Sequence, residues 1–389
     1  MIIELHILQS FPVSNLNRDD VGQPKTATFG GYIRGRISSQ SLKRAARQLF
    51  DQHGLDKSET GVRTKRLLEN AADILVGSDR NRSKEDALGV VEAGLWALGF
   101  GINTKTQLTE YLMFVGHNAI GLLADFCERN WDTLHKVLTE KQKATAAEKA
   151  DAEKKAEEKA KKIKPDKETL AEARRILDAS RVADVALFGR MIADNKYFSV
   201  DAASQVAHAI STHAVANEFD YYTAVDDLKP DAEAGADMIG TVDFNAACYY
   251  RYANLDLDQL SSNLHGDADL TARTARAWLY AFVHAVPSGK QNSMAALTTP
   301  HALLGVVRER GAWNLANAFL TPVARCNFLT VSTDRLLHHF TQLRRFYGDS
   351  DIRSVTAASV DGELPHIEAS EVAAGMDDFA SRVLGSTKA

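Results

Sequence analysis

The sequence predicts an α/β (α+β) fold in which one layer of helices covers a sheet and two large insertions interrupt the pattern. A strand-like segment at the N-terminus is followed, after a long loop, by an amphipathic helix. A long helical stretch and an acidic excursion follow, and strand, helix and strand patterns then return after residue 240. The 389 residues, 45% of them hydrophobic, suffice for one large domain with insertions or for two ordinary domains.

The first expected element is a strand over residues 2–8. Apolar residues alternate there and place Ile3, Leu5 and Ile7 on one face, which we expect to be buried. Residues 10–28 are rich in Pro, Asn, Asp and Gly and predict a long loop. Loops of this length inside a compact domain are usually functional.

The clearest element is a helix that begins near residue 38. Its apolar residues recur at i, i+3, i+4, i+7 and i+8 and define one face: Leu42, Ala45, Ala46, Leu49 and Phe50. Ser38 or Ser39 is a suitable N-cap. Lys43 and Arg47 lie four residues apart on the opposite side. We therefore expect one face of this helix to pack and the other to present cations.

Two excursions separate this helix from the next strand. Residues 60–180 are predominantly helical in pattern and include an Ala/Glu/Lys-rich run over 141–168, which predicts a solvated helix or helical hairpin. Residues 206–241 are dense in acids and resemble a long hairpin or protruding arm. Strand character returns over 242–252, and residues 269–285 are helical in pattern.

The charge distribution is uneven. The net charge of −5 argues against a generic nucleic-acid binder, because binding phosphate requires local positive charge. The first fifty residues nevertheless hold seven basic and three acidic residues, a net charge of +4, so the remainder carries −9. This asymmetry predicts a confined anion site near the N-terminus.

The sequence lacks the signatures of several classes of protein and of functional site. No apolar run is long enough to span a membrane and no signal peptide is evident, so we expect a cytoplasmic protein without a membrane partner. Cys127, Cys248 and Cys326 form no C-x-x-C pair and are expected to be packing residues. His208 and His213 lack the spacing of a metalloprotease helix, and no nucleotide-binding glycine motif is present. We therefore expect neither a metal nor a cofactor.

The N-terminal cations match the requirements of a single-stranded RNA site. Such a site needs cations and hydroxyl or amide donors spaced along successive phosphates. A helix N-terminus adds free backbone N–H groups. The candidates are two loop cations, two residues at the helix start and two cations on the helix face: Arg18, Lys25, Ser38, Gln40, Lys43 and Arg47. On these residues alone, a merely solvated helix face is the more frequent interpretation.

A series of linked motifs favours the RNA-binding interpretation over a merely solvated helix face. The segment Arg36-Ile37-Ser38-Ser39-Gln40-Ser41-Leu42-Lys43-Arg44-Ala45 is the longest of them. The others occupy positions 17–20, 29–31, 189–191, 207–210, 212–213, 223–228, 244, 250–254 and 286–287. Together and in this order they resemble the CasC family, the repeating backbone subunit of the type I-E CRISPR Cascade complex. The likeness covers residues 1–50 and 185–320 and is poor over the last sixty residues.

The resemblance implies a hand-like protein with three parts. They are an RRM-like, ferredoxin-type palm (1–58, 181–205 and 241–389), a helical finger domain (59–180, with the charged insertion 141–168) and a hairpin thumb (206–240). By analogy, the six residues named above contact RNA phosphates. Met191 becomes an apolar wedge beside a displaced base. Leu228, Met238 and Ile239 belong to the base-displacing thumb.

The resemblance also implies a function. Several copies would stack along a guide CRISPR RNA, grip its backbone and present its bases to target DNA in antiviral defence. The implied partners are the guide RNA, target DNA by way of the guide, further copies of the chain, other Cascade subunits and a separately recruited nuclease-helicase. The resulting ribonucleoprotein subunit would not itself be an enzyme.

Two alternatives stay open. One is a metal-independent RNA-processing endoribonuclease on a related palm, with His6 or another histidine as general base, although a histidine on a strand face is more often buried and hydrogen-bonded. The other is a self-assembling structural protein that uses the charged run as a contact surface and binds no nucleic acid.

Overall fold

The chain divides into two compact units. The structure is a computed structural model that describes residues 1–78, 82–103, 106–142, 167–178, 181–191, 198–224, 238–324 and 327–387. Unit 1 comprises residues 1–54, 203–260 and 271–389. Unit 2 comprises residues 55–202 and 261–270. Each unit is described by itself below.

Unit 1 is built on a nine-stranded antiparallel sheet, which confirms the predicted α/β class. Its strands are β1 (Ile2–Ser14), β2 (Thr26–Phe29), β3 (Tyr32–Ile37), β8 (Ser204–Val206), β9 (Ala209–Ser211), β10 (Glu218–Ala224), β11 (Met238–Asp256), β12 (Ala302–Arg308) and β13 (Ile352–Ser359). The main path runs β13-β12-β1-β11-β9-β3-β2, and β8 and β10 also pair with β11. Since β1 extends to Ser14, the expected loop over 10–28 shortens to 15–25. The finer expectation of an RRM-like palm stays a prediction.

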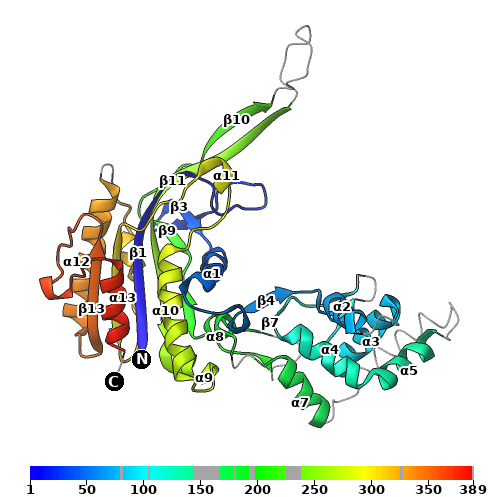
Figure 1. Ribbon diagram of the computed structural model, residues 1–389. Coiled ribbons are helices and arrows are strands. Elements are labelled where there is room, and N and C mark those ends of the chain that lie inside the picture. The colour runs from blue at the N-terminus through cyan, green and yellow to red at the C-terminus, as the bar shows by residue number, and fades with distance from the viewer. Residues whose placement is uncertain are drawn as a thin grey trace, which may run out of the picture. The chain divides into compact units, whose positions relative to one another are not determined.

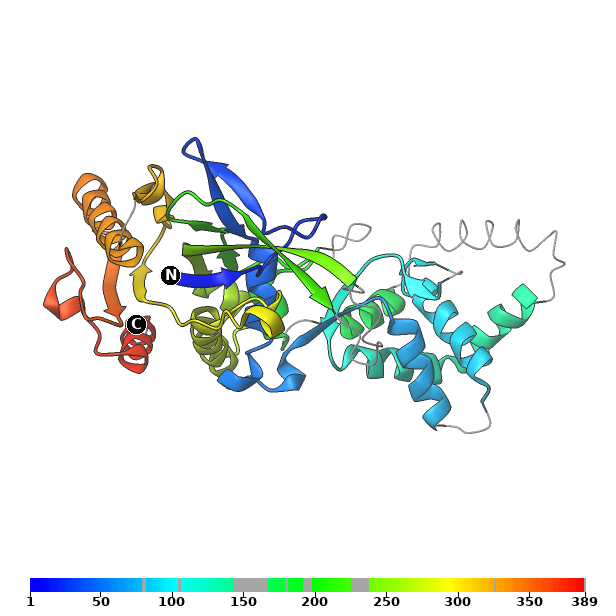
Figure 2. The ribbon, with the colours of Figure 1, turned by 90° about the horizontal axis from the view of Figure 1, so that it is seen from above.

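Helices cover both faces of this sheet, where the sequence predicted a single layer. They are α1 (Ser39–Arg47), α10 (Ala268–His284), α11 (Gln291–Met294), α12 (Phe328–Tyr347) and α13 (Met376–Gly385), with short 3-10 turns η1 (Asp51–His53), η4 (Leu315–Phe319) and η5 (Ala369–Glu371). Leu336 and Phe340 of α12 pack in one core with Leu304 of β12. Gly305, the next residue of β12, instead faces Phe379 of α13. Figure 2 shows α12 and α13 on opposite sides of these strands.

The central strand β1 is buried on both faces. Ile3, Leu5 and Ile7 are fully buried, as the alternation predicted. The other face buries Glu4, whose carboxylate accepts a hydrogen bond of 2.6 Å from Arg308 Nε. Burial raises the pKa of Glu4, and the Arg308 guanidinium opposes that effect. The buried charge is thus paired, as such charges must be in an apolar core.

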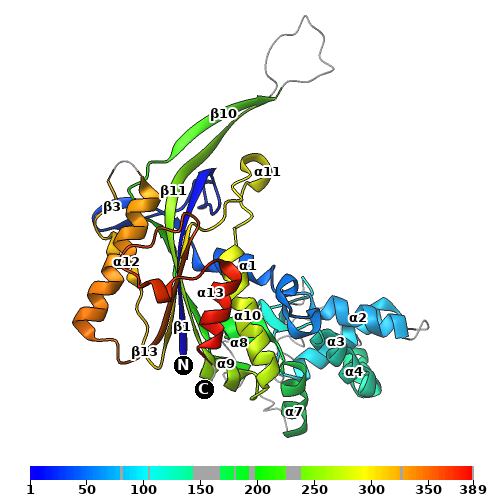
Figure 3. The same cartoon turned by 60° about the vertical axis from the view of Figure 1, so that its left-hand side comes forward.

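The longest strand, β11, serves two purposes. Its residues 245–256 pair with β1 in the centre of the sheet. Residues 238–244 leave the sheet and pair only with β10 among the described strands. We call this two-stranded projection, residues 218–224 and 238–244, the arm. Figures 1 and 3 show the arm extending away from the sheet of unit 1.

Unit 2 is mainly helical, as predicted for residues 60–180, with two short ladders added. Its helices are α2 (Leu67–Ser78), α3 (Lys84–Ala97), α4 (Ala119–Arg129), α5 (Trp131–Gln142), α7 (Lys167–Ile176) and α8 (Ala183–Phe188), with the 3-10 turn η2 (Lys57–Glu59). Helix α9 (Leu257–Asn263) ends in this unit. The ladders join β4 (Gly61–Thr64) to β7 (Met113–Gly116) and β5 (Ile102–Asn103) to β6 (Leu108–Thr109). Most of the predicted charged insertion 141–168 lies outside the described residues.

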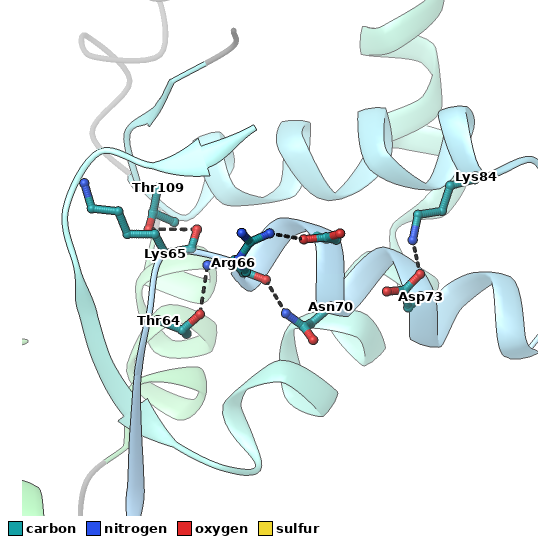
Figure 4. Close-up of polar contacts among 8 residues, drawn as sticks. Thr64, Lys65, Arg66, Asn70, Asp73, Lys84 and Thr109 are labelled. Atoms are coloured by element: carbon teal, nitrogen blue, oxygen red, sulfur yellow. Dashed lines mark hydrogen bonds and ion pairs between the residues drawn. The ribbon is translucent and has the colours of Figure 1, made fainter. Parts of the chain in front are cut away.

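Side chains fix the turn from β4 into α2 (Figure 4). Thr64 Oγ1 accepts a 2.9 Å hydrogen bond from the Arg66 backbone N–H. Asn70 Nδ2 donates to the Arg66 carbonyl at 2.7 Å, and the Thr109 N–H donates to the Lys65 carbonyl at 3.0 Å. Polar contacts therefore order the turn, and Leu67 and Leu68 at the start of α2 pack into the apolar core of unit 2. Among the described helices of the chain, none combines the length and the apolar character needed to cross a bilayer.

Candidate nucleic-acid interface

The loop 15–25 between β1 and β2 is held in place by its own polar side chains. Asn15 Nδ2 donates to the carbonyls of Gly22, at 2.9 Å, and Asp243, at 2.8 Å. Asp19 Oδ1 accepts hydrogen bonds from the backbone N–H groups of Val21 and Gln23. The predicted phosphate contact Arg18 is exposed within this folded loop. Its position is therefore set by the loop and not by burial of its own side chain.

The loop is tied to the start of α1. Asn17 Oδ1 accepts a 2.8 Å hydrogen bond from the backbone N–H of Ser38. Ser38 Oγ in turn accepts from the Ser41 N–H at 3.3 Å, so Ser38 is the N-cap of α1. Gln40, in the first turn, is exposed. Arg18, Ser38 and Gln40 thus belong to one hydrogen-bonded piece of unit 1 that ends in a helix N-terminus, where backbone N–H groups favour anions.

Helix α1 has the packed face that its periodicity predicted, but the predicted cations are not fully exposed on its other side. Leu42, Ala45 and Ala46 are buried. The exposed positions of the helix are Gln40, Arg44 and Gln48, whereas the predicted cations Lys43 and Arg47 are half-buried and make contacts within the chain. A cation in the last turn, such as Arg47, also stabilises the helix dipole. These two side chains can therefore serve the helix as well as a phosphate, and their RNA contact stays a prediction.

The end of the loop brings a further cation and a histidine together. The Arg36 N–H on β3 donates to the Lys25 carbonyl at 2.8 Å, so Lys25 and Arg36 are neighbours on adjacent segments. Arg36 Nη1 lies 3.1 Å from Nδ1 of His208, between β8 and β9. Burial lowers the pKa of His208, and the positive charges of Arg36 and Lys25 lower it further. The sequence pointed to Lys25 but missed Arg36 and His208 as site residues.

Arg34 shares a strand face with Arg36 but has a different role. Its guanidinium is fully buried and donates to the carbonyls of Ser211, at 2.9 Å, and Phe319, at 2.7 Å. These bonds join β3 to β9 and to η4. Arg34 therefore contributes to the local charge balance without being able to reach a ligand phosphate.

Met191 lies in unit 2, directly after two residues, Gly189 and Arg190, whose backbone and side-chain contacts fix the local conformation. Gly189 has φ +75°, and a Cβ there would lie 2.8 Å from the Val200 carbonyl oxygen. The buried Arg190 donates to the carbonyls of Phe198, Leu177 and Phe114. Met191 itself is 87% exposed, beside a shallow hollow lined by Arg63, Tyr111, Leu112, Met113 and Phe114. An exposed, anchored methionine is consistent with an apolar wedge and excludes the core-filling alternative.

The arm carries the predicted thumb residues that can be located. Ile239 is 69% exposed and pairs with Thr223. Since side chains alternate along a strand, Ile239 shares a face with Phe219 and Tyr221, which are 75% and 67% exposed. We call these three residues the apolar stripe. Leu228 lies outside the described residues, and only the backbone of Met238 is described.

His6, the candidate general base of the nuclease alternative, is enclosed. It is 1% exposed, and its Nδ1 lies 2.9 Å from the Tyr250 hydroxyl. Burial, together with the charge of Arg308, lowers the pKa of His6 to about 3. A general base needs access to its substrate and a pKa near the working pH. His6 has neither property and is a packing residue.

His213, Cys127 and Cys248 are chemically reactive side chains that pack inside the described part of the protein. His213 lies against the Phe328 ring, accepts from the Cys248 N–H through Nε2 and contacts the Ala214 carbonyl through Nδ1. Cys127 and Cys248 are buried, and burial raises their thiol pKa values to about 12 and about 11. This confirms two of the three predicted packing cysteines. Within the described ranges, no cluster of three or more His, Cys, Asp or Glu side chains could hold a metal ion.

The predicted site residues that the structure describes belong to different parts of the chain. Six predicted phosphate contacts come from one continuous segment of unit 1, residues 18–47. Met191 belongs to unit 2, and Ile239 to the arm of unit 1. The sequence missed Arg36 and His208 because their contact joins β3 to a segment 172 residues away in the chain. Their presence in family-like motifs was the one available signal.

Comparisons with known proteins extend over the whole chain. The sequence profile of the CT1975-like protein family matches residues 3–382. A search of curated proteins finds no match. A chain of a "CRISPR RNA-guided surveillance complex, pre-nicking" is 29% identical with a TM-score of 0.82, and the match covers 100% of both chains. A chain of another "CRISPR RNA-guided surveillance complex" covers 100% of both chains at 24% identity and a TM-score of 0.74, a likeness of fold alone.

Proposed function

The chain belongs to the CT1975-like protein family, and on that premise we propose that it binds guide RNA as a subunit of a CRISPR surveillance complex. The full-length likeness to a chain of such a complex supports this role. The sequence resemblance to the CasC family points in the same direction. Several finer proposals follow: a type I-E complex, several copies stacked along the guide, and a cytoplasmic role in antiviral defence. Target DNA, other subunits and a recruited nuclease-helicase complete the proposed partners.

The observation that carries the proposal is the cationic segment 15–47 of an otherwise acidic chain. Here Asn17 ties a folded loop to the capped N-terminus of α1, and Arg18, Lys25, Lys43 and Arg47 supply positive charge along it. Such a segment can follow an RNA backbone without reading bases. Sequence recognition would then fall to base pairing between guide and target. We therefore propose that the protein itself is not an enzyme, in keeping with the enclosed position of His6.

The direct test is binding of a single-stranded guide-like RNA to wild type and to the Lys43→Ala/Arg47→Ala variant. Alanine has the highest helix propensity, so the fold of α1 should survive. The matched control is Arg310→Ala/Arg345→Ala, which removes two exposed arginines outside the cationic segment. We expect sequence-independent binding by wild type and control, weakened at least tenfold in the test variant. Absence of binding by wild type would contradict the proposal.

Size-exclusion chromatography with light scattering addresses stacking. If copies assemble along the guide, the mass of the complex should increase in steps with RNA length. A single copy per RNA at every length would overturn the stacking proposal while leaving RNA binding intact.

A further inference from the structure

The side chains of Arg36 and His208 meet where β2 pairs with β3, and Lys25 is the neighbour of Arg36 across the ladder. The register pairs Thr26 with Gly35, so Lys25 and Arg36 are the next neighbours across the ladder. Arg36 Nε donates to the Thr26 carbonyl at 3.3 Å, which leaves Nη1 directed toward His208 Nδ1 at 3.1 Å. Lys25 and Arg36 are half-buried, and His208 is exposed. All three belong to unit 1.

The hydrogen bond between Arg36 and His208 indicates which nitrogen of the His208 ring carries the proton when no RNA is bound. A guanidinium can only donate, so Nδ1 of His208 must be the acceptor and carry no proton. The ring is then neutral, with its proton on Nε2. Burial, Arg36 and Lys25 all lower the pKa of His208, and no acidic group is among the causes that act on it. Burial and the two neighbouring cations thus favour the neutral form of His208.

We propose that Lys25, Arg36 and His208 form an anion site for one phosphate of a single-stranded RNA backbone, and that His208 gains a proton when that phosphate binds. The inference rests on the proposed function and specifies one subsite of it. A phosphate oxygen replaces His208 Nδ1 as the acceptor for Arg36. A proton from solvent then adds to Nδ1, which becomes a second donor to the phosphate, and Lys25 contributes charge.

The proposal requires RNA affinity to depend on pH in a defined direction. In the free protein the pKa of His208 lies below its ordinary value of about 6.5. A bound phosphate raises that pKa, because an anion favours the charged ring. Between these two pKa values RNA binding takes up one proton per site, so affinity rises as pH falls, by up to about tenfold per pH unit. Above both values the dependence disappears.

The test variant is His208→Asn, whose carboxamide oxygen can accept from Arg36 as Nδ1 does but cannot titrate. The matched control is His338→Asn, an exposed histidine on α12. Fluorescence anisotropy gives the Kd for guide-like RNA between pH 5.5 and 7.5 at constant ionic strength. We expect wild type and His338→Asn to bind more tightly at low pH, and His208→Asn to lose most of that gain. Equal pH dependence in all three would overturn the proposal while leaving RNA binding intact.

Calorimetry in buffers of different ionisation enthalpy counts the protons and identifies the ligand. RNA should cause proton uptake that His208→Asn lacks. If inorganic phosphate alone causes His208-dependent uptake and RNA does not, the site takes a free anion, which overturns the assignment to RNA backbone. If wild type binds no RNA at any pH, the proposed function itself fails and this inference with it.

Discussion

At the scale of single residues, chemically identical side chains on one strand face have opposite roles. Arg34 and Arg36 are two residues apart on β3. Arg34 is fully buried and donates to backbone carbonyls, whereas Arg36 reaches His208 at the surface. Alternation along the strand places both on one face, and no local pattern separates them. The difference arises because η4 covers Arg34, a contact that the sequence around β3 does not encode.

Replacing the buried arginine should affect stability, and replacing an exposed one should affect binding. Arg34→Met leaves the Ser211 and Phe319 carbonyls without their donor, which we expect to cost about 1–3 kcal/mol per unsatisfied buried group. Arg18→Met should leave the thermal midpoint nearly unchanged and weaken RNA binding. Differential scanning fluorimetry and RNA titration of both variants check this. Equal losses of stability would show that Arg18 is structural as well.

His6 should make the fold sensitive to acid. Its pKa is about 3 in the folded chain, because of burial and Arg308, and about 6.5 when unfolded. Between those values the unfolded chain binds the proton and the folded chain does not. The contribution of neutral His6 to the free energy of unfolding is therefore fully present above pH 6.5. Below that pH the free energy of unfolding falls by up to about 1.4 kcal/mol per pH unit.

The measurement is the drop in thermal midpoint between pH 7.5 and pH 5 for wild type and His6→Gln. The variant removes the titrating group, so its drop should be smaller, whatever its absolute stability. His338→Gln serves as the control, because His338 is exposed. An equal drop in all three proteins would mean that His6 does not govern acid sensitivity.

At the scale of elements, the predictable ones are those whose signal is local. Helix α1 followed from its apolar period and its cap, and β1 from alternation. The candidate site was predictable to the same extent: Ser38 and the two helix faces are local features, while the Asn17 bond that fixes the loop on α1 joins residues 21 apart. The arm was expected from composition. Its apolar stripe was not identified, since it depends on the pairing of β10 with β11.

The N-cap of α1 separates a structural role from a binding role. Ser38→Ala removes the acceptor for the Ser41 N–H and should lower stability by about 1 kcal/mol. Aspartate is also a good N-cap, so Ser38→Asp should retain most of that stability. Its added negative charge should repel phosphate and weaken RNA binding strongly. Thermal midpoints and RNA affinities of both variants check this, and unchanged affinity in Ser38→Asp would exclude a phosphate at this helix end.

The apolar stripe of the arm should matter for assembly and not for folding. Exposed apolar surface of this kind marks a contact site. Phe219→Ser/Ile239→Ser should change stability by less than about 0.5 kcal/mol, because both side chains are exposed. If the arm contacts the next copy, as the CasC resemblance implies, RNA-dependent oligomers should be lost in light scattering. Phe346→Ser/Val360→Ser, equally exposed in unit 1, should retain them.

At the scale of the whole molecule, the sequence predicted the class of fold and not the order of the sheet. β1 pairs with β11 and β12, which lie more than two hundred residues away along the chain. The periodicity of apolar residues in a sequence does not show which distant strands will pair. The helix on the second face of the sheet, α12, also escaped prediction, because it falls largely in the C-terminal residues that carried no clear motif. The division into palm, finger and thumb stays a prediction.

Charge at this scale predicts how binding responds to salt. A chain of net charge −5 that binds RNA through a cationic segment must do so by local counterion release. The logarithm of the affinity should fall linearly with the logarithm of salt concentration, with a slope of about −0.7 per phosphate neutralised. Arg18→Ala should reduce the slope by about 0.7, and Arg345→Ala should leave it unchanged. An unaltered slope in Arg18→Ala would show that Arg18 contacts no phosphate.

The 19-residue strand β11 joins the sheet and the arm without a break. Because side chains alternate with a period of two, one extra residue in each strand of the arm would turn every side chain beyond it to the opposite face. The apolar stripe would then point away from whatever it contacts. Inherited changes in arm length are therefore expected in steps of two residues per strand, and an odd insertion is expected only with a β-bulge that restores the register.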